Sequence, residues 1–327
     1  METSELFGRI ARLSIASSAL AAGMLSGDFR SAFRGQGMEF DEARHYQWGD
    51  DAKSIDWNAS TRLGTPFVKI FREEREMSVM LLLDTSASMH SAIARPWGSV
   101  ASGGGASSGD NANAQAERLS PYEQALLAAA LVAFSAQRNG QPVGALLFDS
   151  ETDKVFPPRK GRSGVLAFVS GALRYHRPQP ARPQSGARSG VARADGSNLK
   201  AALSAAGRLL KRRGMVVALS DFHSVGWDQE LGRLSHRHDV IAARAYDPAE
   251  ISPPDLGLLS VSDPETGARL SAPTGSESFK EAWRRWHEAR TELWQKMCKK
   301  SGASPLELSV TADAAAVLTR FFRARAK

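Results

Sequence analysis

The chain has 327 residues, of which 42% are hydrophobic, and it carries a formal net charge of +7. Its length allows a large buried core and is typical of about two domains. The single cysteine, Cys298, excludes a disulfide framework and any cysteine-based zinc site, which fits a cytoplasmic protein. No uninterrupted apolar run approaches the roughly 20 residues that span a bilayer, so no transmembrane segment is expected.

Residues 1–76 are predicted to form an N-terminal helix and a β-rich accessory region. The helix is expected over the apolar stretch LSIASSALAAGML, and the β-rich part over the aromatic, turn-rich stretch that follows Gly35. Three aspartates in this part invite a second metal site. We favour a structural brace or docking surface instead, because basic residues lie nearby in sequence and Trp57 could join Trp48, Tyr46 and Phe40 in a small apolar core. The residues given this role are Arg44, Asp50, Asp51, Asp56, Trp57 and Arg62.

Residues 77–250 alternate between continuous apolar runs and segments with helical spacing. This alternation predicts an α/β fold with a doubly wound, mostly parallel sheet, and it places ligands at the carboxyl ends of the strands. Flexible insertions are expected at about 94–119 and 176–196, which are rich in small and polar residues. The expected strands are Met77–Leu83, Val143–Phe148, Met215–Leu219 and Val240–Ala245. The expected helices are Pro121–Arg138, Gly164–Arg174, Asn198–Arg213 and Trp227–Ser235. Gly214 is expected to stop the third of these helices.

Residues 251–327 are predicted to pack on this core as a C-terminal extension. A hairpin should turn around Asp263–Gly267, and a long helix should run over Glu277–Lys300. A strand over Leu306–Val310 and a final helix capped by Thr311 complete the prediction.

The stretch LLLDTSASM ends an apolar strand in one acid and alternating hydroxyls. In a doubly wound sheet these oxygens would lie close to the side-chain oxygens of two other residues. These are Ser197, just before an expected helix, and Asp221, at the end of an expected strand. Mg²⁺ and Mn²⁺ favour such hard oxygen ligands, and Ca²⁺ also takes them. An ion with so few carboxylates can accept a carboxylate from outside. The simpler interpretation is that the acid and serines only cap a turn. The predicted ligands are Asp84, Ser86, Ser88, Ser197 and Asp221.

These residues carry a resemblance. DTSAS after LLL, with GSNL and LSDF, resembles the metal-ion-dependent adhesion site of von Willebrand factor A domains. The stretch from GQGMEF through ARHYQWGDDAKSIDWNASTR to DTSASM is similar to the bacterial domain-of-unknown-function-58 family, as are YDPAE, DPETG and TADAAAVLTRFFRAR. The sequence departs from that pattern at Lys53, at Ser60-Thr61, at Ser197 in place of Thr and at Asn198 in place of Asp.

The resemblance implies a von Willebrand factor A-like fold and a non-enzymatic partner of a MoxR-type AAA+ ATPase. Such pairs act as chaperone-like assembly or maturation factors, with a client protein held at the metal face.

Two other functions remain open from the residues. An acid at a strand end with Mg²⁺ could be the nucleophile of a haloacid-dehalogenase-like phosphohydrolase, although Ser86 stands where such enzymes carry a second acid. The basic charge could serve nucleic-acid binding, but no specific nucleic-acid motif is present.

Overall fold

The computed structural model describes residue 8 and residues 38–51, 54–73, 77–90, 119–150, 154–175, 197–253, 255, 257–262 and 269–325. The predicted N-terminal helix and almost all of both predicted insertions therefore fall outside the described residues. No helix in the part of the chain that the structure describes is long and apolar enough to cross a membrane.

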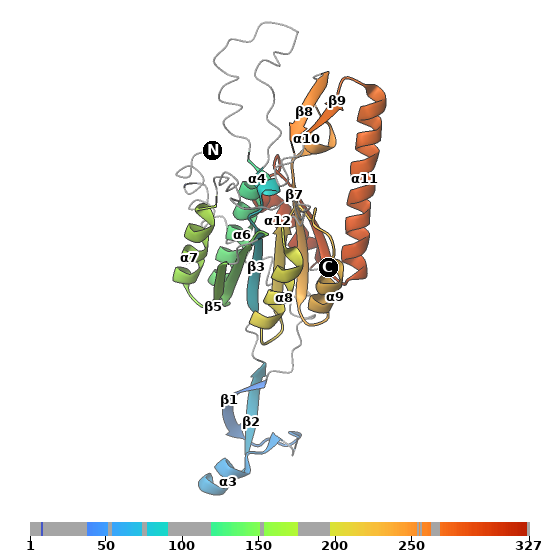
Figure 1. Cartoon of the computed structure of the whole chain (residues 1–327). Helices are drawn as coiled ribbons and strands as arrows, with labels where there is room; N and C mark the ends of the chain where they lie inside the picture. The colour runs from blue at the N-terminus through green and yellow to red at the C-terminus, as the bar shows by residue number, and fades with distance from the viewer. Residues whose placement is uncertain are drawn as a thin grey trace, which may run out of the picture.

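A six-stranded sheet forms the centre of the molecule (Figure 1). Its order is β10-β7-β6-β3-β4-β5, and all neighbours are parallel except edge strand β5 (Lys154–Arg159), which runs antiparallel to β4. The mixed α/β class with a mostly parallel sheet is thus confirmed. The parallel strands are β3 (Ser78–Asp84), β4 (Val143–Phe148), β6 (Gly214–Ser220), β7 (Asp239–Tyr246) and β10 (Ser304–Ser309).

Helices cover both faces of the sheet, and each face has its own apolar core. In β3, Val79, Leu81 and Leu83 enter one core while Met80 and Leu82 enter the other, which explains why the strand reads as one continuous apolar run. The first face carries α6 (Pro121–Arg138), α7 (Arg162–Leu173) and α12 (Ala314–Arg325). The second carries α8 (Leu199–Leu209), α9 (Asp228–Ser235) and the C-terminal half of α11 (Glu277–Lys300).

Helix α6 has the predicted boundaries, and local chemistry explains why. The Ser120 hydroxyl accepts a hydrogen bond from the Glu123 N–H (3.2 Å), and the Glu123 carboxylate accepts one from the Ser120 N–H (2.7 Å). This capping box satisfies two N–H groups that a helix start leaves without partners, and Pro121 occupies the first turn, where no N–H is needed.

The accessory region forms a small unit of β1 (Met38–His45), β2 (Phe67–Glu73) and, between them, α3 (Trp57–Leu63). In Figure 1 it lies beyond the end of the sheet at which β3 begins. Arg44 forms an ion pair with Asp50, with the two side chains joined at 2.7 Å, and this hydrogen bond lowers the pKa of Asp50. Asp56 caps α3 by accepting the N–H groups of Asn58 and Ala59. Such a cap contributes about 1 kcal/mol to stability.

Two predictions for this unit are wrong. Its helix α3 was not expected, and Trp48 and Trp57 do not enter an apolar core, since they are 100% and 68% exposed. A two-stranded ribbon offers no second layer against which such side chains could be buried. Asp51 is also exposed, and Arg62 lies exposed in the last turn of α3, without an ion pair among the described residues.

The C-terminal region follows its prediction closely. Short helix α10 (Pro248–Ile251) leads into the antiparallel hairpin of β8 (Leu258–Ser262) and β9 (Arg269–Pro273), and α11 has the predicted bounds. The hairpin, α10 and the start of α11 stand at the end of the sheet where β3 ends (Figure 1). Strand β10 then adds a parallel edge beside β7.

Four local predictions need correction. The helix after Asn198 ends at Leu209, and Gly214 does not stop it but begins β6. Strand β5 was missed. Asp313, rather than Thr311, caps the final helix, because its carboxylate accepts the Ala315 N–H at 2.8 Å.

Candidate metal centre

The carboxyl ends of β3 and β6 lie side by side in the middle of the sheet. Leu83 pairs in register with Leu219, so Asp84 and Ser220 are neighbours at the edge, and Asp221 follows directly. The chain leaves β3 toward α6 on one face and leaves β6 toward α9 on the other. Such a divergence opens a crevice, which is the usual ligand position in a doubly wound sheet.

Asp84 is fully buried, and both of its carboxylate oxygens accept hydrogen bonds. Oδ1 accepts the Ser86 N–H (3.0 Å) and Oδ2 accepts the Ser220 hydroxyl (2.6 Å). Burial, followed by the like charge of Asp221, raises the pKa of Asp84 to about 7. A nearby cation would relieve both causes and favour the charged carboxylate.

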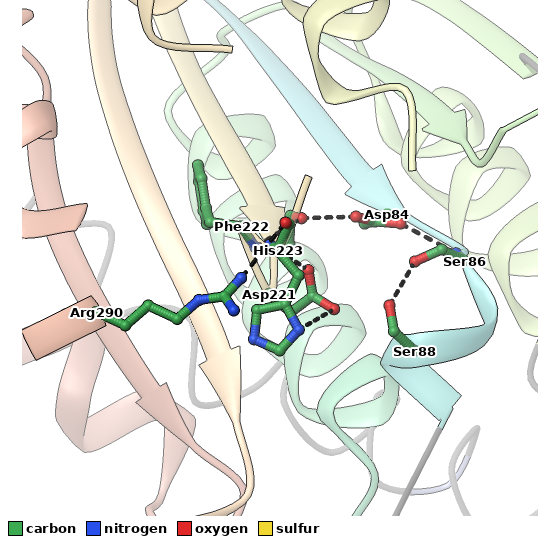
Figure 2. A network of polar contacts seen from close by, with 8 residues as sticks. Asp84, Ser86, Ser88, Asp221, Phe222, His223 and Arg290 are labelled. Carbon is green, nitrogen blue, oxygen red and sulfur yellow. Dashed lines mark hydrogen bonds and ion pairs between the residues drawn. The ribbon is translucent and has the colours of Figure 1, made fainter. Parts of the chain in front are cut away.

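The two serines of the DTSAS stretch, Ser86 and Ser88, lie close together, as their alternate spacing predicts. The Ser86 and Ser88 hydroxyl oxygens lie 3.1 Å apart at the start of the short helix α4 (Ala87–His90) (Figure 2). Thr85, between Asp84 and Ser86 in the pattern, points away from them, and its hydroxyl donates to the Phe148 carbonyl at 3.0 Å. The Ser86 and Ser88 hydroxyls therefore lie at the candidate site, whereas the Thr85 hydroxyl forms a hydrogen bond between the ends of β3 and β4.

Asp221 begins a constrained loop. Its Oδ1 accepts the His223 N–H (2.8 Å), and its Oδ2 lies 3.5 Å from the His223 ring nitrogen Nδ1 (Figure 2). Oδ2 is buried and, within the described part of the chain, has no hydrogen-bond partner. Phe222 holds a left-handed backbone with φ of 56°, which costs on the order of 1–2 kcal/mol for such a residue. Its ring is packed against Trp227 and Trp294, so the surrounding structure enforces this conformation.

Ser197 is buried two residues before the start of α8. The N–H of the next residue, Asn198, donates to the Asp149 carbonyl at 3.2 Å, just beyond the end of β4. Since β4 pairs with β3, this contact places Ser197 at the same edge of the sheet as Asp84. The Asn198 side chain caps α8 through the Ala201 N–H and is therefore occupied locally.

Further acidic groups lie near Asp221. Glu250, in α10, is close enough to Asp221 and Asp247 that both add to the effect of burial in raising its pKa to about 7. Desolvation lowers the pKa of His223, and Asp221 only partly offsets it. The site thus gathers negative charge that a cation would compensate.

Sequence reasoning missed two residues here. Ser220 links the site, since its hydroxyl donates to Asp84 while its oxygen accepts the Phe222 N–H at 3.1 Å. Pairing the strand ends LLLD and ALSD in register would have found it. Arg290, whose Nη2 donates to the His223 carbonyl at 3.4 Å, comes from α11, and no local pattern points to it.

This donor set suits a hard divalent cation. It offers the two carboxylates of Asp84 and Asp221 and several serine hydroxyls, and the buried Oδ2 of Asp221 accepts no hydrogen bond from the described residues. Among the described residues, no three His, Cys, Asp or Glu side chains lie close enough together to hold a metal ion by themselves. A cation here would therefore depend on serine hydroxyls as much as on acids. The Asp50 and Asp56 block lies at the opposite end of the sheet and takes no part (Figure 1).

Comparison with known protein families identifies the family of this chain. The chain belongs to the family described as "Protein of unknown function DUF58", whose model matches residues 42–95 and 107–292. That match includes both Asp84 and Asp221.

Individual relatives are similar over much of the chain. Uncharacterized proteins of Mycobacterium bovis and Mycobacterium tuberculosis are each 30% identical to it over 246 residues. The match covers 75% of this chain and 66% of those proteins, just under two thirds of their length. An uncharacterized protein of Mycobacterium avium is 30% identical over 129 residues, which cover 39% of this chain and 76% of that protein.

Proposed function

We propose that the protein is a non-enzymatic, metal-dependent protein-binding module of the von Willebrand factor A kind. Asp84, Ser86, Ser88, Ser197 and Asp221 would hold Mg²⁺, or Mn²⁺ or Ca²⁺ in its place. The ion supplies a Lewis-acid position to which an outside carboxylate can bind. The protein's own residues fix the positions of the ligand oxygens.

One observation carries this proposal. Asp84 and Asp221 lie at the ends of adjacent central strands, next to Ser220, whose hydroxyl donates to Asp84. The buried Oδ2 of Asp221 accepts no hydrogen bond from the described residues and has only the His223 ring nitrogen nearby, at 3.5 Å. Burying a carboxylate oxygen without a partner costs a few kcal/mol, so such an atom is retained where a ligand compensates for it.

The geometry favours a ligand role for Asp84 over that of a phosphohydrolase nucleophile. A nucleophile needs an accessible oxygen aimed at the substrate. Asp84 is fully buried and both oxygens already accept hydrogen bonds, which leaves lone pairs for an ion but no open approach for a phosphorus atom.

The resemblance stated from the sequence adds the partners. A MoxR-type AAA+ ATPase would supply ATP hydrolysis, and a client protein would be held at the metal face while a protein complex is assembled or matured. The small unit with Trp48 and Trp57 exposed is a second surface available for such partners.

The test is a pull-down of a MoxR-type ATPase and of cellular proteins by wild type and Asp84→Ala, each with Mg²⁺ and with EDTA. Wild type with Mg²⁺ should recover at least one partner about tenfold better than the other three samples, because loss of a ligand carboxylate removes the ion. Glu292→Ala, which removes an exposed acid of α11 that pairs with Lys296 and belongs neither to the candidate site nor to the unit with Trp48 and Trp57, serves as the matched control and should behave as wild type.

Equal recovery of every partner in all samples would contradict metal-dependent binding. Mg²⁺-dependent phosphate release from a phosphomonoester, lost in Asp84→Ala, would instead establish the phosphohydrolase.

A further inference from the structure

Arg290 reaches from α11 to the edge of the candidate metal centre, where it forms no ion pair with a described residue. Its only hydrogen bond in the described part of the chain is the 3.4 Å contact with the His223 carbonyl (Figure 2). Two other arginines of α11, Arg284 and Arg285, each pair with a glutamate one turn away on the same helix. Arg290 has no such ion pair among the described residues, although it is partly buried.

Two further nitrogen-bearing side chains, those of Arg244 and His287, lie near Arg290. Arg244 is 4% exposed, donates to the Thr291 hydroxyl at 2.6 Å, and has no ion pair in the described part. His287 is 5% exposed, and neither of its ring nitrogens has a hydrogen-bond partner there. Burial, then the positive charges of Arg244, His223 and Arg290, lowers the pKa of His287 to about 4. Arg244 and Arg290 therefore form no ion pair among the described residues, although Asp221 and Glu250 lie close enough to act on Arg290 electrostatically.

An exposed aromatic side chain borders this region. Trp286 is 51% exposed, and the Arg290 guanidinium lies 5.2 Å from its ring centre. The ring also contacts Trp283, whose indole N–H donates to the Glu250 carbonyl at 2.7 Å and so fixes the aromatic pair against α10. A rigid tryptophan beside an arginine is the composition found at the energetic centres of protein interfaces.

We propose that Arg290 and Trp286 form a second anchor, for an acidic side chain of the same polypeptide segment whose carboxylate binds the metal. The inference rests on the proposed function. The occupant is a partner segment that carries two acidic residues, one at the ion and one at Arg290, with its neighbouring atoms against Trp286.

Three arguments select this occupant. A guanidinium offers a planar fork that a carboxylate matches with two hydrogen bonds. The anchor is continuous with the metal centre, because Arg290 contacts the loop that carries Asp221. Asp221 also attracts Arg290 electrostatically, and a bound cation would weaken this attraction and leave the guanidinium available to a partner.

The test uses fluorescent Gly/Ser peptides that carry one aspartate, or an aspartate and a glutamate with spacers of increasing length. Binding to the full chain is measured by fluorescence anisotropy in Mg²⁺ and in EDTA. At the best spacing, the second acid should tighten Mg²⁺-dependent binding by about tenfold or more, the usual effect of a charged hydrogen bond. Arg290→Gln should remove this gain but keep the binding of the single-acid peptide.

Arg285→Gln is the matched control, since Arg285 lies on the same helix and already pairs with Glu281. It should retain the gain. Arg290→Glu should reverse the preference toward a peptide with lysine in the second position, which a merely unfolded variant cannot do.

The outcomes separate the two proposals. If single-acid peptides bind with Mg²⁺ but no spacer gives a gain, or the gain survives Arg290→Gln, the second anchor is wrong and the metal centre stands. If binding is equal in Mg²⁺ and EDTA, the metal-dependent function is wrong. Competition by inorganic phosphate that depends on Arg290, without any gain from a second acid, would show a phosphate site instead and overturn the anchor. Failure of every peptide to bind contradicts both.

Discussion

Magnesium should stabilise this protein much more at pH 8 than at pH 6. The pKa of Asp84 is raised from its usual 3.8 to about 7, a difference on the order of 4 kcal/mol between its protonation states. Without metal, folding takes up a proton, so the stability contributed by this group is lost as pH rises from about 4 through about 7. A cation binds only the charged carboxylate and compensates for that loss. At pH 6 the proton competes, which lowers metal affinity about tenfold relative to pH 8.

The measurement is the shift in melting temperature on adding Mg²⁺ at the two pH values. Asp84→Asn should show a small shift that does not depend on pH. Glu250 has its pKa in the same range, so Glu250→Gln is included and should keep the pH-dependent shift. An equal Mg²⁺ effect at both pH values in wild type would show that Asp84 is not coupled to the ion.

Gly214→Ala is expected to lower the free energy of unfolding by about 3 kcal/mol, near the upper end of the usual cost of overpacking. A Cβ at this position would lie 2.5 Å from the Ser78 carbonyl oxygen, which belongs to the backbone of the neighbouring strand and cannot move aside. Gly214 pairs with Ser78 at the start of the β3–β6 register that brings Asp84 beside Ser220 at the other end. The substitution should therefore also weaken metal binding.

Urea denaturation measures this effect, and Gly207→Ala is the matched control. A Cβ at Gly207, inside α8, would meet only the flexible Leu234 side chain at 3.4 Å. Because alanine favours helices over glycine by up to ~1 kcal/mol, this variant should be as stable as wild type or slightly more so. Similar losses in both variants would show that close strand approach does not explain Gly214.

Local signals predicted most of the core. The cap at Ser120 and the continuous apolar runs of β3, β4, β6 and β7 act over a few residues, so they can be recognised without the tertiary structure. Strand β5 was not predicted because its sequence, KVFPPR, contains two prolines, which an edge strand tolerates and a central strand does not. Gly214 was misread because a glycine after a helix is an ordinary stop signal, whereas here the contact with Ser78 requires it.

The candidate site was predictable to the extent that its residues follow strand ends. Asp84 and Asp221 both do, and parallel neighbours bring such residues to one edge. The support around them was not predictable, because Arg244, His287 and Arg290 come from a strand and a helix that meet only in the tertiary structure. The exposure of Trp48 and Trp57 was not predicted either. Their aromatic spacing is typical of a core, but the small unit has no second layer.

Isothermal titration with Mn²⁺ tests the central idea most directly, because it measures ion binding without requiring a partner. Wild type and Asp50→Asn should each bind one ion per chain with the same affinity, and Asp221→Asn should bind it at least about tenfold more weakly. If Asp221→Asn binds the ion as wild type does, or if only Asp50→Asn loses it, the ends of β3 and β6 are not a metal centre.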